Sequence, residues 1–137
     1  MLIISIIAGL LSGMNMWVVD PDDMQLHIND FYMAILMTGW MLFMETILDY
    51  NHYKDIKLRL IIAILIISFT IFAIRKQFFV TDKQFLKGMI PHHSMAILMS
   101  EKILKKTKNP KIKKLAYEII KSQEKEINEM NQIIKQS

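Results

Sequence analysis

Three long apolar runs occupy the first half of the chain. They are residues 2–19, 31–48 and 60–74. The first and third contain no charged residue, and Glu45 is the only one in the second. A helix that crosses a bilayer needs about 20 mainly apolar residues. The third run is shorter, but the long side chains of Arg59 and Arg75 at its ends can extend it toward water. The pattern predicts three membrane-spanning helices.

Two other interpretations of these runs compete with the membrane. They could be the buried helices of a soluble protein, but a chain of 137 residues has too little other material to cover three helices that are apolar all round. The first run could be a signal peptide, yet it lacks a basic start and a small-residue cleavage site. The missing basic start also leaves open whether Met1 is the natural beginning of the protein.

The C-terminal part has the pattern of amphipathic helices. Apolar residues recur there three and four positions apart, and Asp82 is the expected N-cap of a first helix. Pro91 lies inside this helix and should kink it or remove one hydrogen bond. A second helix is expected from about Pro110 to Ile134. Because the connector is short and a proline starts the second helix, the two should form an antiparallel hairpin.

The predicted fold is therefore all-α, with an anchor followed by a hairpin. We expect a three-helix transmembrane anchor at residues 1–76, a linker at 77–81 and a hairpin domain at 82–137. Two helices alone bury little apolar surface, so the hairpin should pack on the anchor or on a second copy, as half of a four-helix bundle. A homodimer or higher oligomer is expected.

Composition narrows the chemistry. Cysteine is absent, which excludes disulfides and thiol ligands, whereas methionine occurs 12 times. Seven lysines fall between Lys102 and Lys114, without the interleaved aromatic residues of a nucleic-acid surface. We expect a solvated face there, with anionic lipid as the alternative, and no nucleic-acid partner.

Four side chains of the first amphipathic helix share one face. Met89, His92, His93 and Met99 fall within about a third of its circumference, centred on the apolar stripe. Thioether and imidazole ligands together favour Cu(I), and by extension Ag(I), over hard cations. Met130 of the second helix should approach Met89 and complete this soft metal site. The alternative for a histidine on an apolar face is a hydrogen-bonded core residue.

Polar groups in the facing apolar stripe suggest a supporting role. If the hairpin pivots near Lys108, Gln123 lies opposite His93, and Glu126 lies opposite residue 89 or 90. Polar groups on an apolar face need partners, so both could hydrogen-bond the second nitrogen of a ligating imidazole. Accessory ligands are drawn from Met95, Met24 and His27. The competing interpretations are a filler role for Met95 and a solvated loop for the other two.

The motif around the histidine pair resembles a known family. Residues 85–99, which contain Met-Ile-Pro-His-His, and the later Gln123-x-x-Glu-Ile-x-x-Met130 resemble the domain of unknown function 305 family, including members with three N-terminal membrane helices. The resemblance implies a ferritin-like helical bundle, often extracytoplasmic, with some relatives that bind copper or silver. It implies metal roles for Met89, His92, His93 and Met99, and for Met130. The Ser94-Met95 pair departs from the commoner Gln-Gly or Ala-Gly.

Loop charges give an orientation. The loop at residues 20–30 has four aspartates and no lysine or arginine, whereas Lys54, Lys57 and Arg59 lie in the loop after the second run. Because cytoplasmic loops are rich in basic residues, the hairpin should lie outside. Arg75 and Lys76 argue against this, and the family resemblance favours it. We expect an integral protein of the plasma or inner membrane with an extracytoplasmic C-terminal domain.

The predicted function is the binding of copper or silver for metal buffering, delivery or resistance. The alternative is a metal-free membrane scaffold whose hairpin associates with another protein. Catalysis is not expected, because the sequence has no Glu-x-x-His pair, no nucleophile–base constellation and no phosphate-binding glycine loop.

Overall fold

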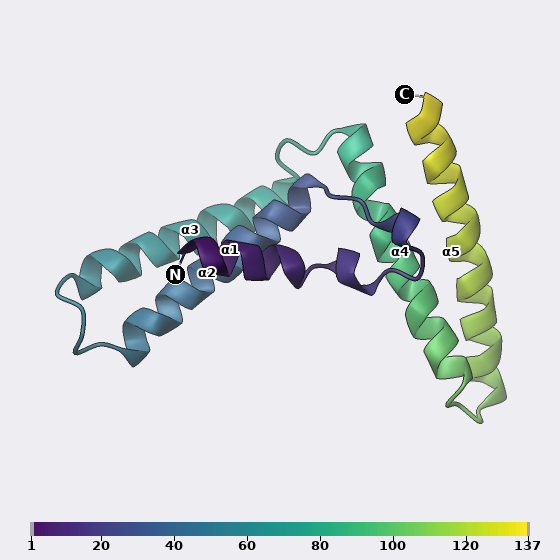
Figure 1. Cartoon of the computed structure of the whole chain (residues 1–137), viewed down its shortest axis with the longest axis horizontal. Coiled ribbons are helices and arrows are strands. Elements are labelled where there is room, and N and C mark those ends of the chain that lie inside the picture. Colours follow the sequence, from purple (N-terminus) through teal and green to yellow (C-terminus); the bar gives the residue numbers. More distant parts are fainter. Residues whose placement is uncertain (1, 137) are drawn as a thin grey trace. The chain divides into compact units, whose positions relative to one another are not determined.

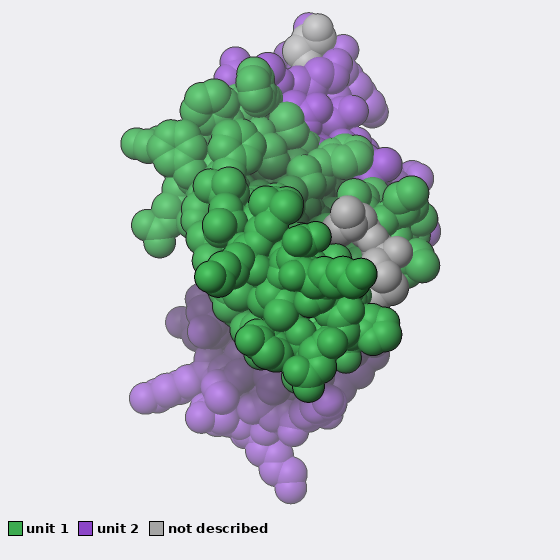
Figure 2. Space-filling view, turned by 90° about the vertical axis from the view of Figure 1, so that its left-hand side faces the viewer, with its two compact units in different colours: residues 1–13, 28–80 green, residues 14–27, 81–137 purple. Residues whose placement is uncertain are grey.

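The computed structural model describes residues 2–136. Their regular elements are helices, joined by turns and loops, with no strand among these residues. In chain order the elements are α1 (Leu2–Leu11), the 3-10 turns η1 (Met14–Trp17) and η2 (Pro21–Asp23), α2 (Ile28–Leu48), α3 (Ile56–Lys76), α4 (Asp82–Leu104) and α5 (Pro110–Gln136) (Figure 1). They form two compact units (Figure 2). One comprises the chain up to residue 13 together with residues 28–80, and the other comprises residues 14–27 and the chain from residue 81 onward.

Small residues bring the helices of the first unit together. A side chain at Gly9 of α1 would place its Cβ 2.7 Å from Cα of Ala34 in α2. On another face of α2, a Cβ at Gly39 would lie 2.9 Å from Ile67 of α3. The buried residues of α3 are Ala63, Ile67, Thr70 and Ala73. Close contact through Gly, Ala and Thr is typical of helices that pack in a membrane, where no hydrophobic effect pulls them together.

The turn between α2 and α3 is fixed by polar contacts. The Tyr53 hydroxyl donates to Oε1 of Glu45 at 2.6 Å, and Arg59 lies 3.7 Å from Oε2 of the same carboxylate. The guanidinium also stacks 3.8 Å above the Tyr53 ring. The hydrogen bond to Glu45 raises the pKa of Tyr53. Glu45, which interrupts the second apolar run, therefore has partners at the end of its helix.

The first apolar run does not form one long helix. Helix α1 has 10 residues. At a rise of about 1.5 Å per residue, its length is roughly half the thickness of the hydrocarbon core of a bilayer. Beyond Leu11 the chain turns, and the Asn15 side chain exchanges two hydrogen bonds with the backbone of Gln25. Within the described residues two helices, α2 and α3, are long and apolar enough to cross a membrane, against the three expected.

In the second unit, α4 and α5 lie side by side and run in opposite directions (Figure 1). The chain reverses between Leu104 and Pro110, where the Asn109 side chain accepts a hydrogen bond from the Lys111 amide and caps α5. Helix α4 is continuous through Pro91. The buried core between the two helices consists of Ile90, Ile97, Ile127 and Met130.

The N-cap of α4 is Thr81 and not Asp82 as expected. The Thr81 hydroxyl accepts a hydrogen bond from the Gln84 amide at 3.3 Å, and Asp82 is the first helical residue. Either residue type can cap a helix. The backbone decides, because Thr81 is extended while Asp82 is already helical.

The segment at residues 14–27 packs on α4. The Val19 amide donates to the fully buried Ser94 hydroxyl at 2.9 Å. The His27 ring lies against Gly88, where a Cβ would come within 2.5 Å of Cδ2. Residues 14–27 therefore group with α4 and α5, although the chain places them before α2.

Candidate soft-metal site

His93 is a buried residue that bridges α4 and α5. Its Nδ1 lies 2.8 Å from the carbonyl oxygen of Met89, and its Nε2 lies 2.7 Å from Oε2 of Glu126. A carbonyl and a carboxylate are both acceptors, so each ring nitrogen of His93 lies against a protein oxygen. Both nitrogens are therefore already engaged, and neither is open to a metal in this arrangement.

The Glu126 carboxylate has a second donor on its own helix. The Ser122 hydroxyl donates to Oε1 at 2.7 Å, one turn before Glu126. This hydrogen bond, followed by the one from His93, lowers the pKa of Glu126 because each stabilises the charged form. Sequence reasoning did not single out Ser122, although its spacing of four residues from Glu126 was a readable signal.

The pairing of the helices differs by about one turn from the expected one. His93 faces Glu126, whereas the expected pivot near Lys108 placed it opposite Gln123. The reversal is centred on Asn109 and Pro110, because the Asn109 cap makes Pro110 the first residue of α5. Gln123 is half-buried one turn earlier.

Two of the predicted ligands belong to the apolar core. Met130 is buried with Ile90, Ile97 and Ile127, and the half-buried Met89 packs against the same cluster. Met130 therefore lies in the water-poor layer between α4 and α5, and Met89 lies at the edge of that layer. Thioethers in this position also fill the core, as methionine often does.

The other two predicted ligands lie outside the buried core. His92 is exposed, and 62% of the Met99 surface is accessible to solvent. Helix α5 covers the edge of the predicted arc that carries residues 89 and 93. The structure therefore brings Met89, His93 and Met130 to one interface, leaves His92 exposed, and places Met99 on an uncovered part of the face between α4 and α5.

The accessory candidates lie on or near another face of α4. Met95 is half-buried, three residues after His92. His27 contacts Gly88, and Met24 in the same segment is 49% exposed. Within residues 2–136, no group of three or more His, Cys, Asp or Glu side chains could hold a metal ion.

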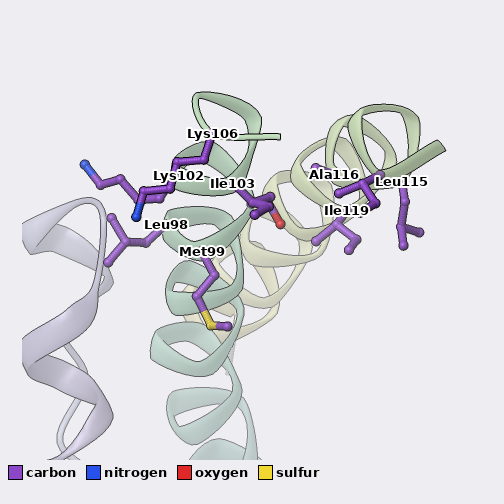
Figure 3. A pocket seen from close by; sticks show the side chains of 10 residues that line it. Leu98, Met99, Lys102, Ile103, Lys106, Leu115, Ala116 and Ile119 are labelled. Atoms are coloured by element: carbon purple, nitrogen blue, oxygen red, sulfur yellow. The ribbon is translucent and has the colours of Figure 1, made fainter. Parts of the chain in front are cut away.

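An apolar groove runs between α4 and α5 near the reversal (Figure 3). Its volume is about 560 Å³. Its lining includes Met99, Ile103, Ile112 and Leu115, with Lys102 and Lys106 also contributing. The four apolar residues are between 39% and 62% exposed, so the groove is an uncovered part of the face between the helices.

Comparison with known proteins places the chain in a family. Residues 74–136 match the family described as Domain of unknown function (DUF305). The uncharacterized protein L153 of Acanthamoeba polyphaga mimivirus is 55% identical over 134 residues, which cover 98% of this chain and 88% of the relative. The chain belongs to the DUF305 family. The DUF305 match begins in the last turn of α3 and covers α4 and α5, so residues 14–27 lie outside it. No solved structure matches the chain.

Proposed function

We propose that this DUF305 protein is a membrane-anchored protein that binds Cu(I), or Ag(I), through methionine and histidine side chains of α4, for metal buffering, delivery or resistance. One observation carries the proposal. His92 is an exposed imidazole with thioethers three residues away on either side, at Met89 and Met95, while the neighbouring His93 is engaged by Glu126.

The donor set fits a soft monovalent metal. Residues three apart on a helix are surface neighbours, with Cβ atoms about 5–6 Å apart, so either methionine can reach the side of the His92 ring. Imidazole and thioether together favour Cu(I) over hard cations, and a thioether ligates without losing a proton. Met99, seven residues after His92, lies on the same side of α4 and can add a third sulfur.

His93 and Glu126 have a supporting role in this proposal. Their ion pair ties α5 to α4 across 2.7 Å. The pair keeps the face of α4 that carries His93 against α5. The adjacent His92 therefore lies on the side of α4 that is exposed to solvent. This assignment revises the expectation that both histidines ligate the metal.

A metal titration of the full-length protein in detergent tests the proposal. We expect one equivalent of Cu(I) or Ag(I) to bind, and His92→Ala to weaken the affinity by at least tenfold. His93→Ala, at the neighbouring position, is the matched control. It should lower the melting temperature and retain most of the metal affinity. Unchanged affinity of His92→Ala would contradict the proposal.

The anchor in this proposal is the α2–α3 pair. Only 22% of the most apolar window of each helix is buried within the protein, which leaves an apolar surface that suits lipid. Two crossings return the chain to its starting side, so residues 14–27 and the α4–α5 pair would share one side of the membrane. The basic residues Lys54, Lys57 and Arg59 that follow α2 favour an extracytoplasmic position for that side, whereas Arg75 and Lys76 argue against it.

The groove near the reversal supports a second candidate function, association through the α4–α5 pair. Two copies that covered this groove would form a ferritin-like four-helix bundle. Leu115→Asp should then shift the detergent-solubilised protein toward the monomer in light scattering, while Glu124→Asp, exposed farther along α5, should not. A wild-type protein that is monomeric at all concentrations would exclude this function.

A further inference from the structure

The segment at residues 14–27 carries a histidine, His27, that contacts α4. A Cβ built on Gly88 would lie 2.5 Å from Cδ2 and 2.9 Å from Nε2 of His27. The Cδ2–Nε2 edge of the ring therefore faces α4, while Nδ1 is buried. With the ring in this position, residue 88 has no room for a Cβ, and only glycine lacks one.

The segment is held in place by its own polar contacts. The Val19 amide donates to Ser94 of α4, and the Asn15 side chain pairs with the Gln25 backbone two residues before His27. His27 is thus carried by an ordered segment and not by a free loop.

Helix geometry also directs a side chain at residue 92 toward the position above Gly88. Residues four apart lie one above the other on a helix, and helical side chains tilt toward the N-terminus, so the patch covered by a side chain lies over the preceding turn. The turn that precedes His92 contains Gly88, which has no side chain to fill the space. Met95 lies seven residues after Gly88 on the same face.

We propose that His27 is the second imidazole ligand of a soft-metal site centred on His92, so that the metal is held between residues 14–27 and α4, with Met95 as the thioether. This inference rests on the proposed function and adds a ligand from outside the DUF305 match. Two imidazoles and a thioether form a set of three soft or borderline donors, which suits Cu(I) and Ag(I). The role of Gly88 is to leave room for the His27 ring.

Titration of the full-length protein in detergent with Ag(I), in chloride-free buffer, tests this site. We expect His27→Ala to weaken Ag(I) affinity at least tenfold. Gly88→Ala should do the same although residue 27 is intact, because the added Cβ displaces the ring and alanine favours the helix. His52→Ala is the matched control, since His52 belongs to the other unit.

A packing role for His27 gives different results. His27→Phe keeps a ring but removes both nitrogens, so we expect a melting temperature close to that of the wild type together with the weakened affinity. In ¹⁵N NMR of the imidazole rings, one equivalent of Ag(I) should shift the nitrogens of His27 and His92 together. The nitrogens of His93, which are engaged by Met89 and Glu126, should not shift.

The outcomes separate this inference from the proposed function. Wild-type affinity in His27→Ala and His27→Phe, with binding lost in His92→Ala, would overturn the role of His27 and leave metal binding by α4 intact. A wild-type protein that binds no Ag(I) would overturn both.

Discussion

At the scale of single residues, two adjacent histidines have different environments. His93 is 7% exposed and both of its ring nitrogens lie within hydrogen-bond distance of protein oxygens, whereas His92 is exposed beside it. The difference arises because a rotation of 100° about the helix axis separates a face covered by α5 from one that is open. The His-His motif therefore combines one residue that links α4 to α5 and one whose imidazole is exposed.

Replacing each histidine by alanine should show this difference. His93→Ala removes two hydrogen bonds and leaves a buried void, so we expect a loss of about 2 kcal/mol in the free energy of unfolding. His92→Ala should change it by less than about 0.5 kcal/mol, as for most surface substitutions. Denaturation of the full chain, followed by circular dichroism, measures both. Equal destabilisation by the two changes would contradict a structural role for the His93–Glu126 pair.

The Glu126 carboxylate should make stability depend on acid pH. Its pKa is lowered from the ordinary value of 4.5, first by the Ser122 hydroxyl and then by His93. A folded-state pKa below the unfolded one stabilises the fold at pH values above 4.5, and this contribution disappears as the pH falls through the lowered pKa. We expect the melting temperature of the wild type to fall more steeply below pH 4.5 than that of Glu126→Gln.

Ser122→Ala should shift this acid transition toward higher pH, because it removes the first cause of the lowered pKa. Glu124→Gln, at an exposed position of α5, is the matched control and should keep the wild-type profile. Identical pH profiles for wild type and Glu126→Gln would show that the carboxylate has no such role.

At the scale of elements, close approach at glycine determines how the helices pack. Gly9 sets the distance between α1 and α2, and Gly88 admits residues 14–27 to α4. The neighbour is the Ala34 backbone in the first case and the His27 ring in the second. These contacts were not predicted, because a glycine in an apolar or amphipathic helix does not reveal what approaches it.

Gly9→Ala should loosen α1. The new Cβ would lie 2.7 Å from the Ala34 Cα, so α1 must shift even though alanine favours the helix. We expect the amides of α1 to lose protection in hydrogen exchange. Gly13→Ala is the matched control, because its Cβ would meet no atom closer than 3.4 Å. Unchanged protection of α1 in Gly9→Ala would argue against this packing.

At the scale of the whole molecule, the compact units do not follow the chain order. Residues 14–27 precede both long apolar helices, yet they group with the part of the chain that follows them. If α2 and α3 cross a membrane, this grouping requires both flanks to emerge on one side. The topology can therefore be tested without knowing which side that is.

Single cysteines in this cysteine-free chain report the sidedness. We expect Leu26→Cys and Lys108→Cys to react with a membrane-impermeant maleimide from the same side of sealed vesicles. Asn51→Cys, in the turn between α2 and α3, should react from the opposite side. Labelling of residues 26 and 108 from opposite sides would exclude a two-crossing anchor.

The amino-acid sequence by itself determined the helical class, the ends of α2, α3 and α5 and the start of α4 to within a few residues, and the family. Hydrophobic periodicity and the Met-Ile-Pro-His-His motif are local signals, so they can be read without a fold. The extents of α2 and α3 followed from apolar length, and the start of α5 from Pro110.

Only the tertiary structure decided which side of each helix is covered. The early end of α1, the one-turn difference in pairing that joins His93 to Glu126, and the position of His27 over Gly88 all depend on contacts between distant residues. A periodic pattern gives the face of a helix that prefers an apolar environment. It does not specify the partner, because many neighbours can bury the same stripe and only shape and hydrogen bonding select among them.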